Sequence, residues 1–202
     1  MSELVVLPIC PFGNVKWWTH FLSTERVQLN GYEYYQKQTW RNRYDILGAN
    51  GKQSLTIPIS KPSGEKVKTK DLQLFHETHW KKVHWRSIKS AYGSSPFWIY
   101  YSDQIEELFK KEFTSLQEFS LASIKLIIEE LQLDKEVHIA LQKAEESSLD
   151  FSKDFKPSKC DFKNKAYLQV FDDRFPFHEN LSVLDVLFNL GPEAEGYLRS
   201  LN

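Results

Sequence analysis

The chain has 202 residues, 41% hydrophobic and 14% aromatic, which is enough for one domain with a sizeable core. Its 26 basic and 27 acidic residues give a formal net charge of −1, which argues against a dedicated nucleic-acid binder. No apolar run approaches the roughly 20 residues that cross a bilayer, and the N-terminus lacks the pattern of a signal peptide. We therefore expect a cytoplasmic protein without membrane insertion, with a single domain over residues 1–202.

The N-terminal part has the pattern of an α/β unit. Its elements are a short buried strand over residues 4–8, a loop over 9–14, an amphipathic helix over 15–23 and a second strand over 27–29. Ligands of such units commonly bind at the carboxyl ends of the strands. Residues 8–13 and 30–37 would both lie at that edge.

A β-hairpin is predicted around Gly48-Ala49-Asn50-Gly51, because Asn-Gly readily supplies positive φ angles. Residues 43–47 and 53–59 would be its strands. The next segment, residues 60–70, is basic and contains Gly, Pro and Ser, which is typical of a solvated connection. Residues 71–75 then have the alternation of a further strand.

Helical periodicity marks most of the second half. A helix is expected from a cap at Thr78 or His79 to Tyr92, before Gly93, with one face formed by Trp80, Val83, His84, Ser87 and Ala91. Two helical pieces are predicted within 103–133, divided by a capping box at Ser115–Glu118. After them we expect a strand over 137–141 and an extended or mobile loop over 143–165. The last elements are a strand or extended segment over 167–171 and helices over 182–190 and 193–201. The fold class is therefore α/β: a single domain whose mixed β-sheet is packed by helices, with a C-terminal helical segment.

Two arginines in the run Trp40-Arg41-Asn42-Arg43 are the first candidates for a binding site. If this run is a strand, Arg41 and Arg43 point to the same face, where two guanidinium groups could hold a pyrophosphate or a carboxylate. The alternative is a pair of surface arginines bonded to acidic neighbours. Nearby aromatic residues favour the anion site, and Lys37 could add positive charge.

His84 is the candidate general base, because imidazole titrates near neutral pH. The alternative is a packed, hydrogen-bonded core histidine. Cys10 lacks His or Asp spacing for catalysis and is interpreted as a small buried hydrophobe, and no zinc signature includes His76 and His79. We expect reduced cysteines, although one bridge between Cys10 and Cys160 is conceivable. Phosphate-loop, dinucleotide-binding and serine-hydrolase motifs are absent, so neither a cofactor nor a metal is predicted.

Several runs together resemble the WbqC-like protein family over nearly the whole chain. The matching elements are the first strand and its Pro-containing loop, Trp40-Arg41-Asn42-Arg43, Gly48 to Pro58, Trp80 to Trp85, Ala91-Tyr92-Gly93 before Pro96-Phe97, Tyr167 to Phe171, and Asn180 to Asn189. The loop Ile9 to Gly13 departs from the Tyr-Phe-Pro-Pro pattern that is typical of the family. The resemblance implies a bacterial cytoplasmic protein associated with O-antigen or other surface-polysaccharide gene sets.

With this setting, the residues predict a transferase-like enzyme that binds an anionic small molecule, such as a nucleotide sugar or an acyl donor. Acyl or aminoacyl transfer to an activated or amino sugar is one form of that reaction. Arg41, Asn42, Arg43 and Lys37 would bind the substrate, His84 would accept a proton, and Trp80 or Tyr92 would shape the cleft. The alternative is a non-catalytic scaffold of a glycan-assembly complex, with dispersed site residues and an exposed aromatic patch.

Overall fold

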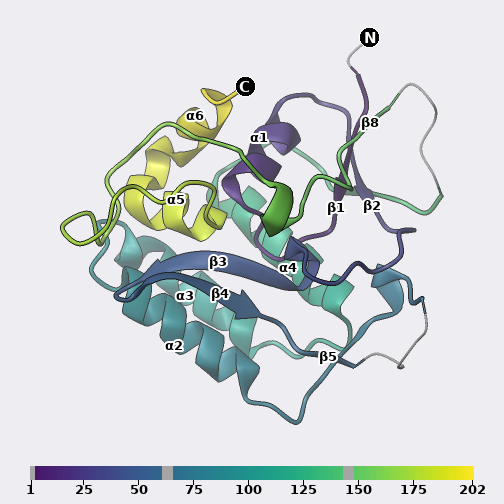
Figure 1. Ribbon diagram of the computed structural model, residues 1–202, viewed down its shortest axis with the longest axis horizontal. Coiled ribbons are helices and arrows are strands. Elements are labelled where there is room, and N and C mark those ends of the chain that lie inside the picture. Colours follow the sequence, from purple (N-terminus) through teal and green to yellow (C-terminus); the bar gives the residue numbers. More distant parts are fainter. Residues whose placement is uncertain (1–2, 61–65, 143–147) are drawn as a thin grey trace.

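The computed structural model describes residues 3–60, 66–142 and 148–202. A four-stranded sheet of order β7-β2-β1-β8, parallel throughout, lies at one end of the molecule (Figure 1). The strands are β1 (Val5–Pro8), β2 (Val27–Asn30), β7 (His138–Ala140) and β8 (Leu149–Asp150). The α/β class and the predicted strands at both ends of the N-terminal unit are confirmed. The parallel and antiparallel strands form separate sheets.

Helix α1 (Val15–Leu22) connects β1 to β2, as predicted. Its N-cap is Asn14, whose side chain accepts a hydrogen bond from the backbone N–H of Trp17. The apolar face of the helix is aromatic: Trp17, Trp18 and Phe21 are buried and contact one another. Because these rings fill the space beside β1, they fix where the loop between β1 and α1 can run.

The predicted hairpin is confirmed as β3 (Arg43–Gly48) and β4 (Gly51–Thr56), paired antiparallel with Gly48 opposite Gly51. Gly51 has a φ of +96°, which only glycine adopts readily. The hairpin crosses the middle of the molecule between the parallel sheet and helices α2 and α3 (Figure 1). A second short antiparallel pair consists of β5 (Ile59–Ser60) and β6 (Gln73–Leu74).

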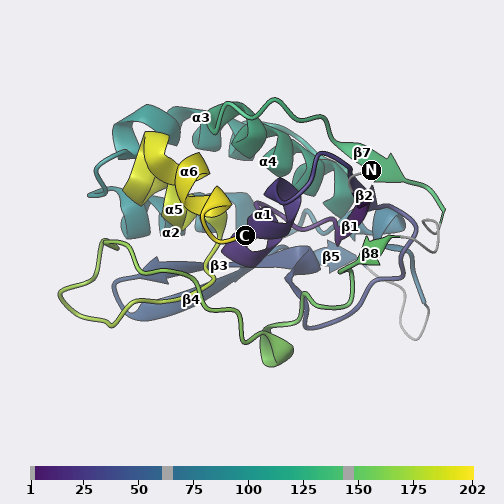
Figure 2. The same ribbon diagram turned by 90° about the horizontal axis from the view of Figure 1, so that it is seen from above.

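Three helices cover the hairpin and the core from one side (Figure 2). They are α2 (Trp80–Tyr92), α3 (Trp98–Lys110) and α4 (Leu116–Glu130), and the capping box of Ser115 and Glu118 is confirmed at the start of α4. The predicted placement of Val83 on the buried face is wrong, since it is 55% exposed. The buried face follows Trp80, His84, Ile88 and Ala91, which shifts its centre away from Val83.

The last part of the chain returns to α1. Helices α5 (Val183–Leu190) and α6 (Ala194–Arg199) form the predicted C-terminal helical segment and contact α1. Of the predicted loop over residues 143–165, residues 143–147 lie outside the described part, and Leu149–Asp150 adds strand β8 to the sheet edge. Residues 167–169 form no strand. The 3-10 helices are η1 (Trp40–Asn42), η2 (Thr69–Asp71), η3 (Pro157–Lys159) and η4 (Gly191–Glu193).

Candidate functional site

The loop after β1 is tightly fixed at the carboxyl edge of the sheet. Phe12 and Gly13 have φ angles of 59° and 68°, a conformation that is rare for a residue with a side chain such as Phe12. Trp17 Nε1 donates to Pro8 O at 2.8 Å and Trp18 Nε1 donates to Phe12 O at 2.7 Å. A Cβ atom at Gly13 would lie 2.8 Å from Trp18 Nε1, so only glycine fits there. Strained and over-determined backbone of this kind concentrates at functional sites.

Arg41 is completely buried beneath this edge in a bidentate ion pair with Glu33. Its Nε donates to Glu33 Oε1 at 2.7 Å, and its Nη2 donates to Glu33 Oε2 at 2.5 Å and to Ser152 O at 2.7 Å. Asn30 completes the network, accepting from Glu33 N at 3.0 Å and donating to Ser152 Oγ at 3.0 Å. Burial raises the pKa of Glu33, and the Arg41 guanidinium opposes that rise. Arg41 therefore ties together the ends of β2 and β8.

Arg43 has a different environment from Arg41. The side-by-side arrangement that a strand would give does not occur, because Trp40–Asn42 is a 3-10 helix and only Arg43 begins a strand. Arg43 is half-buried, and its Nε donates to Thr39 O at 3.2 Å. No ion pair joins Arg43 to a carboxylate among the residues that the structure describes. Its charge is therefore available to a ligand.

Asp45 is the acidic residue nearest to Arg43 in sequence, and both of its carboxylate oxygens accept hydrogen bonds from other residues. Asp45 Oδ2 accepts a hydrogen bond from Trp40 Nε1 at 3.1 Å, and its Oδ1 accepts one from the hydroxyl of Ser54. These bonds hold the Asp45 carboxylate in the hairpin and fix the Trp40 indole. Asp45 therefore does not pair with the Arg43 guanidinium, which has no carboxylate partner among the described residues.

A narrow cleft of about 210 Å³ of empty space lies between the β1–α1 loop and the start of β3. It is too narrow for a water molecule as it stands, so a ligand would have to displace a side chain at its rim. Burial raises the pKa of the Cys10 thiol to about 12, so the Cys10 side chain contributes no negative charge to the cleft at pH 7. The lining residues are Cys10, Pro11, Gly13, Asn14, Trp17, Trp40, Arg43, Tyr44 and Phe155.

His84 lies in a separate place, at the contact between α2 and the hairpin. Its Nε2 is 3.2 Å from Thr56 O, which can only accept, so Nε2 carries the proton and Nδ1 accepts from the Tyr44 hydroxyl at 2.9 Å. Burial lowers the pKa of His84 to about 4. Both nitrogen atoms of this neutral ring are engaged, and the ring borders a surface groove rather than the Arg43 cleft.

The other predicted site residues do not gather around Arg43. Trp80 is buried edge-to-face against Phe119, with ring centroids 5.2 Å apart. Asn42 is buried and donates to Ile57 O at 3.1 Å, Tyr92 is fully buried, and Lys37 is exposed. Of the predicted set, the structure therefore brings only Arg43 to the cleft. It adds Asn14 from the helix cap and Phe155 from the polar segment after β8.

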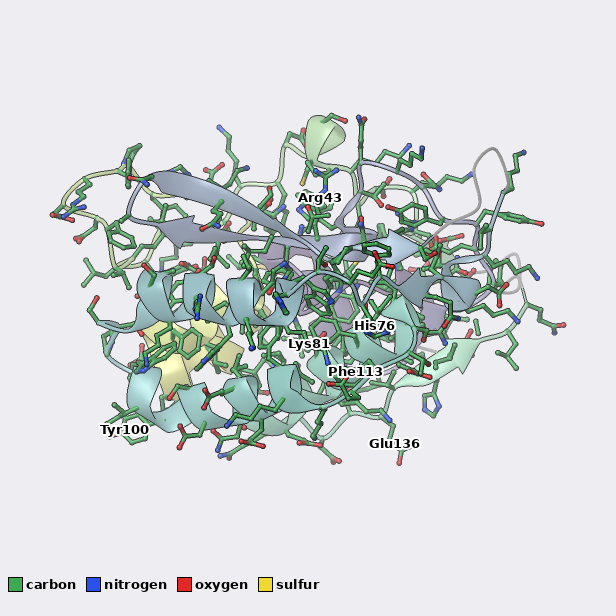
Figure 3. All side chains as sticks on the ribbon, turned by 90° about the horizontal axis from the view of Figure 1, so that it is seen from below. Arg43, His76, Lys81, Tyr100, Phe113 and Glu136 are labelled. Carbon is green, nitrogen blue, oxygen red and sulfur yellow. The ribbon has the colours of Figure 1, made fainter. Side chains whose placement is uncertain are left out.

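A larger groove of about 1150 Å³, which includes open solvent, runs beside the start of α2. His76 and Lys81 lie there, apart from Arg43 at the hairpin (Figure 3). Lys81 is already engaged, because its Nζ donates to Lys111 O at 2.7 Å and pairs with Glu112 at 3.1 Å. Lys110, which also lines the groove, pairs with Glu106 and Glu107, and the lining includes the carboxylates of Glu106 and Glu112, unlike that of the Arg43 cleft.

Neither a metal cluster nor a membrane-spanning helix occurs in the described part of the chain. Among residues 3–60, 66–142 and 148–202, no three His, Cys, Asp or Glu side chains are grouped as metal ligands. Over the same residues, none of the helices combines the length and the apolar character needed to cross a bilayer.

In architecture this is an α/β protein with a small cleft at the carboxyl end of a central parallel strand. The chain belongs to the WbqC-like protein family, which matches residues 19–158, as the resemblance predicted. "Uncharacterized protein Rv1507c" of Mycobacterium tuberculosis is 28% identical over 78 residues, covering 39% of this chain and 33% of that protein. The match therefore spans about a third of that relative's length. No solved structure is significantly similar.

Proposed function

We propose that the cleft at the carboxyl edge of the sheet receives the anionic group of a small-molecule substrate, with Arg43 as its charged contact. The protein would act as a transferase-like enzyme of bacterial surface-polysaccharide synthesis, using a nucleotide sugar or an acyl donor. The observation that carries the proposal is the half-buried Arg43 guanidinium, which lines the cleft without a carboxylate partner among the described residues.

Arg43 and Arg41 differ in how many of their guanidinium nitrogens are free to bind a ligand. A guanidinium already bound to both oxygens of Glu33 has little to offer a ligand, whereas Arg43 keeps its terminal nitrogens for a bidentate contact. The cleft does not admit a water molecule as it stands, so only one end of a substrate would enter it, after a side chain at its rim has moved. The aromatic rings of Trp40 and Phe155 at the same cleft supply apolar contact beside the charge.

The polysaccharide setting is proposed from the resemblance to the family, and the transfer reaction is proposed from the predicted anionic substrate. The runs by which this chain resembles the family include Arg43 and the following hairpin, so the proposal places the substrate where these runs meet the sheet. No base is assigned, because His84 borders a different groove.

Calorimetric titration of nucleotide sugars and acyl donors at low salt tests this proposal. Arg43→Ala should weaken binding of an anionic ligand by about 10- to 150-fold, the range for a lost hydrogen bond to a charged group. Arg86→Ala is the matched control, because Arg86 is exposed on α2 and lines a different groove, so its removal should leave affinity unchanged. Equal affinity of wild type and Arg43→Ala would refute the site. A scaffold protein would bind none of these ligands.

A further inference from the structure

The cleft contains a buried hydrogen-bond donor that the protein itself does not use. Asn14 is 6% exposed, and its Nδ2 has no hydrogen-bond partner among the described residues. The cleft that Asn14 lines is too narrow for a water molecule, so solvent does not satisfy this donor there. Buried donors in native proteins are nearly always paired, and an exception calls for an explanation.

The orientation of the Asn14 amide is fixed by its role as a helix cap. Its Oδ1 accepts from the backbone N–H of Trp17 at 3.0 Å. Turning the amide over would place the NH₂ group against that N–H, and two donors cannot bond to each other. The unpartnered Nδ2 is therefore a consequence of capping α1, and it belongs to a side chain that lines the cleft.

The other polar groups around the cleft show which kind of ligand would complete it. The indole N–H groups of Trp17 and Trp40 already donate to Pro8 O and Asp45, and the Tyr44 hydroxyl donates to His84. The described residues that line the cleft include no carboxylate. Among the described side chains that line the cleft, the N–H donors that remain are Asn14 Nδ2 and the terminal nitrogens of Arg43, so the missing partner is an acceptor that carries negative charge.

We infer that Asn14 is a specificity-determining residue of this site, and that Asn14 Nδ2 and Arg43 together bind oxygens of one oxyanion on the substrate, a carboxylate or a phosphate. The inference rests on the proposed function and adds a second contact to it. Among the described residues, the hydrogen bond of the Arg43 guanidinium is the 3.2 Å contact of Nε with Thr39 O, so the side chain can shift to admit the group and then bind it.

Two substitutions separate binding from capping. Asn14→Asp and Asn14→Ser both keep an oxygen that can cap Trp17 N, but neither retains the amide donor. Asp also brings a negative charge next to the cleft that would repel an oxyanion. The probes are sodium acetate and inorganic phosphate, followed by the ¹⁵N–¹H signal of the Asn14 side-chain amide and by backbone shifts of the β1–α1 loop.

With wild type, one of the two anions should shift the Asn14 side-chain signal, and which anion does so identifies a carboxylate or a phosphate. Asn14→Ser should weaken that binding by about tenfold and Asn14→Asp by about 100-fold, while thermal unfolding stays at or above the wild-type temperature. Unchanged affinity in both variants would overturn the role of Asn14 even if Arg43→Ala loses binding. If neither anion binds wild type, or if Arg43→Ala binds as well as wild type, both the inference and the proposed site fail.

Discussion

Replacing His84 with Gln should remove a specific part of the acid sensitivity of this fold. His84 is buried, and its neutral ring is held between the Tyr44 hydroxyl and Thr56 O. Burial lowers its pKa to about 4, against an ordinary value near 6.5, so the unfolded chain binds the proton more readily than the folded one. The neutral ring therefore stabilises the fold fully above pH 6.5, and this contribution falls as the pH drops towards 4.

The size of the effect follows from those two values. Between pH 7.5 and pH 5 the unfolded state gains almost a full proton at this position while the folded state gains about a tenth, which lowers the free energy of unfolding by about 2 kcal/mol. Glutamine retains one donor and one acceptor but does not titrate. The His84→Gln variant should therefore lose about 2 kcal/mol less than wild type over the same pH interval.

Urea unfolding at pH 7.5 and pH 5, followed by the fluorescence of the 6 tryptophans, measures this difference. His138→Gln is the control, because the His138 side chain is 65% exposed at the sheet edge. Other groups also titrate in this interval, so the comparison is between variants rather than between pH values alone. If wild type and His84→Gln lose equal free energy, the assignment of a buried neutral imidazole is refuted.

Three further substitutions, each at a different contact of the fold, are tested by urea unfolding at pH 7.5. Arg41→Ala should destabilise by about 3–5 kcal/mol because it leaves the Glu33 carboxylate buried and unpaired, whereas replacing both partners by Met should recover most of that loss. Gly13→Ala should cost about 1–3 kcal/mol from backbone strain, and more if Trp18 must move, while the control Gly196→Ala in α6, where a Cβ meets nothing within 4 Å, should not destabilise. Ser115→Ala should cost about 1 kcal/mol by removing the capping box of α4, and no loss would contradict that role.

Local patterns were sufficient to predict most of the fold. The strand at residues 4–8, the Asn-Gly hairpin and the Ser115 capping box depend on neighbours in sequence, and all three are confirmed. Strand β8 could not be predicted in this way, since Leu149–Asp150 is a strand only because it pairs with β1. Its residues lie in a polar segment whose extended form is decided by a distant partner.

In the candidate site, too, local sequence predicts some features, and residues distant in sequence decide the others. The sequence placed Arg41 and Arg43 together, but Glu33 and Ser152 bury the first, and no short-range pattern discloses that contact. The helical period predicts that His84 faces inward, but the engagement of both its ring nitrogens depends on Tyr44 and Thr56, which are distant in sequence. Asn14 had a local signal as a helix cap, whereas its unused amide hydrogens depend on the closure of the surrounding loop.

The first turn of α1 is hydrogen-bonded to the segment before α5, and this contact affects the order in which the protein folds during translation. Val15 N donates to Leu181 O, and Lys16 N donates to Asn180 Oδ1 across a separation of 164 residues. During translation, β1, α1 and β2 leave the ribosome early, yet this joint has no acceptors until the segment before α5 has been synthesised. The cleft would therefore form only after residues 180 and 181 have left the ribosome, and ribosomes stalled before residue 180 would carry a chain whose sheet has begun to form but whose first loop lacks these contacts.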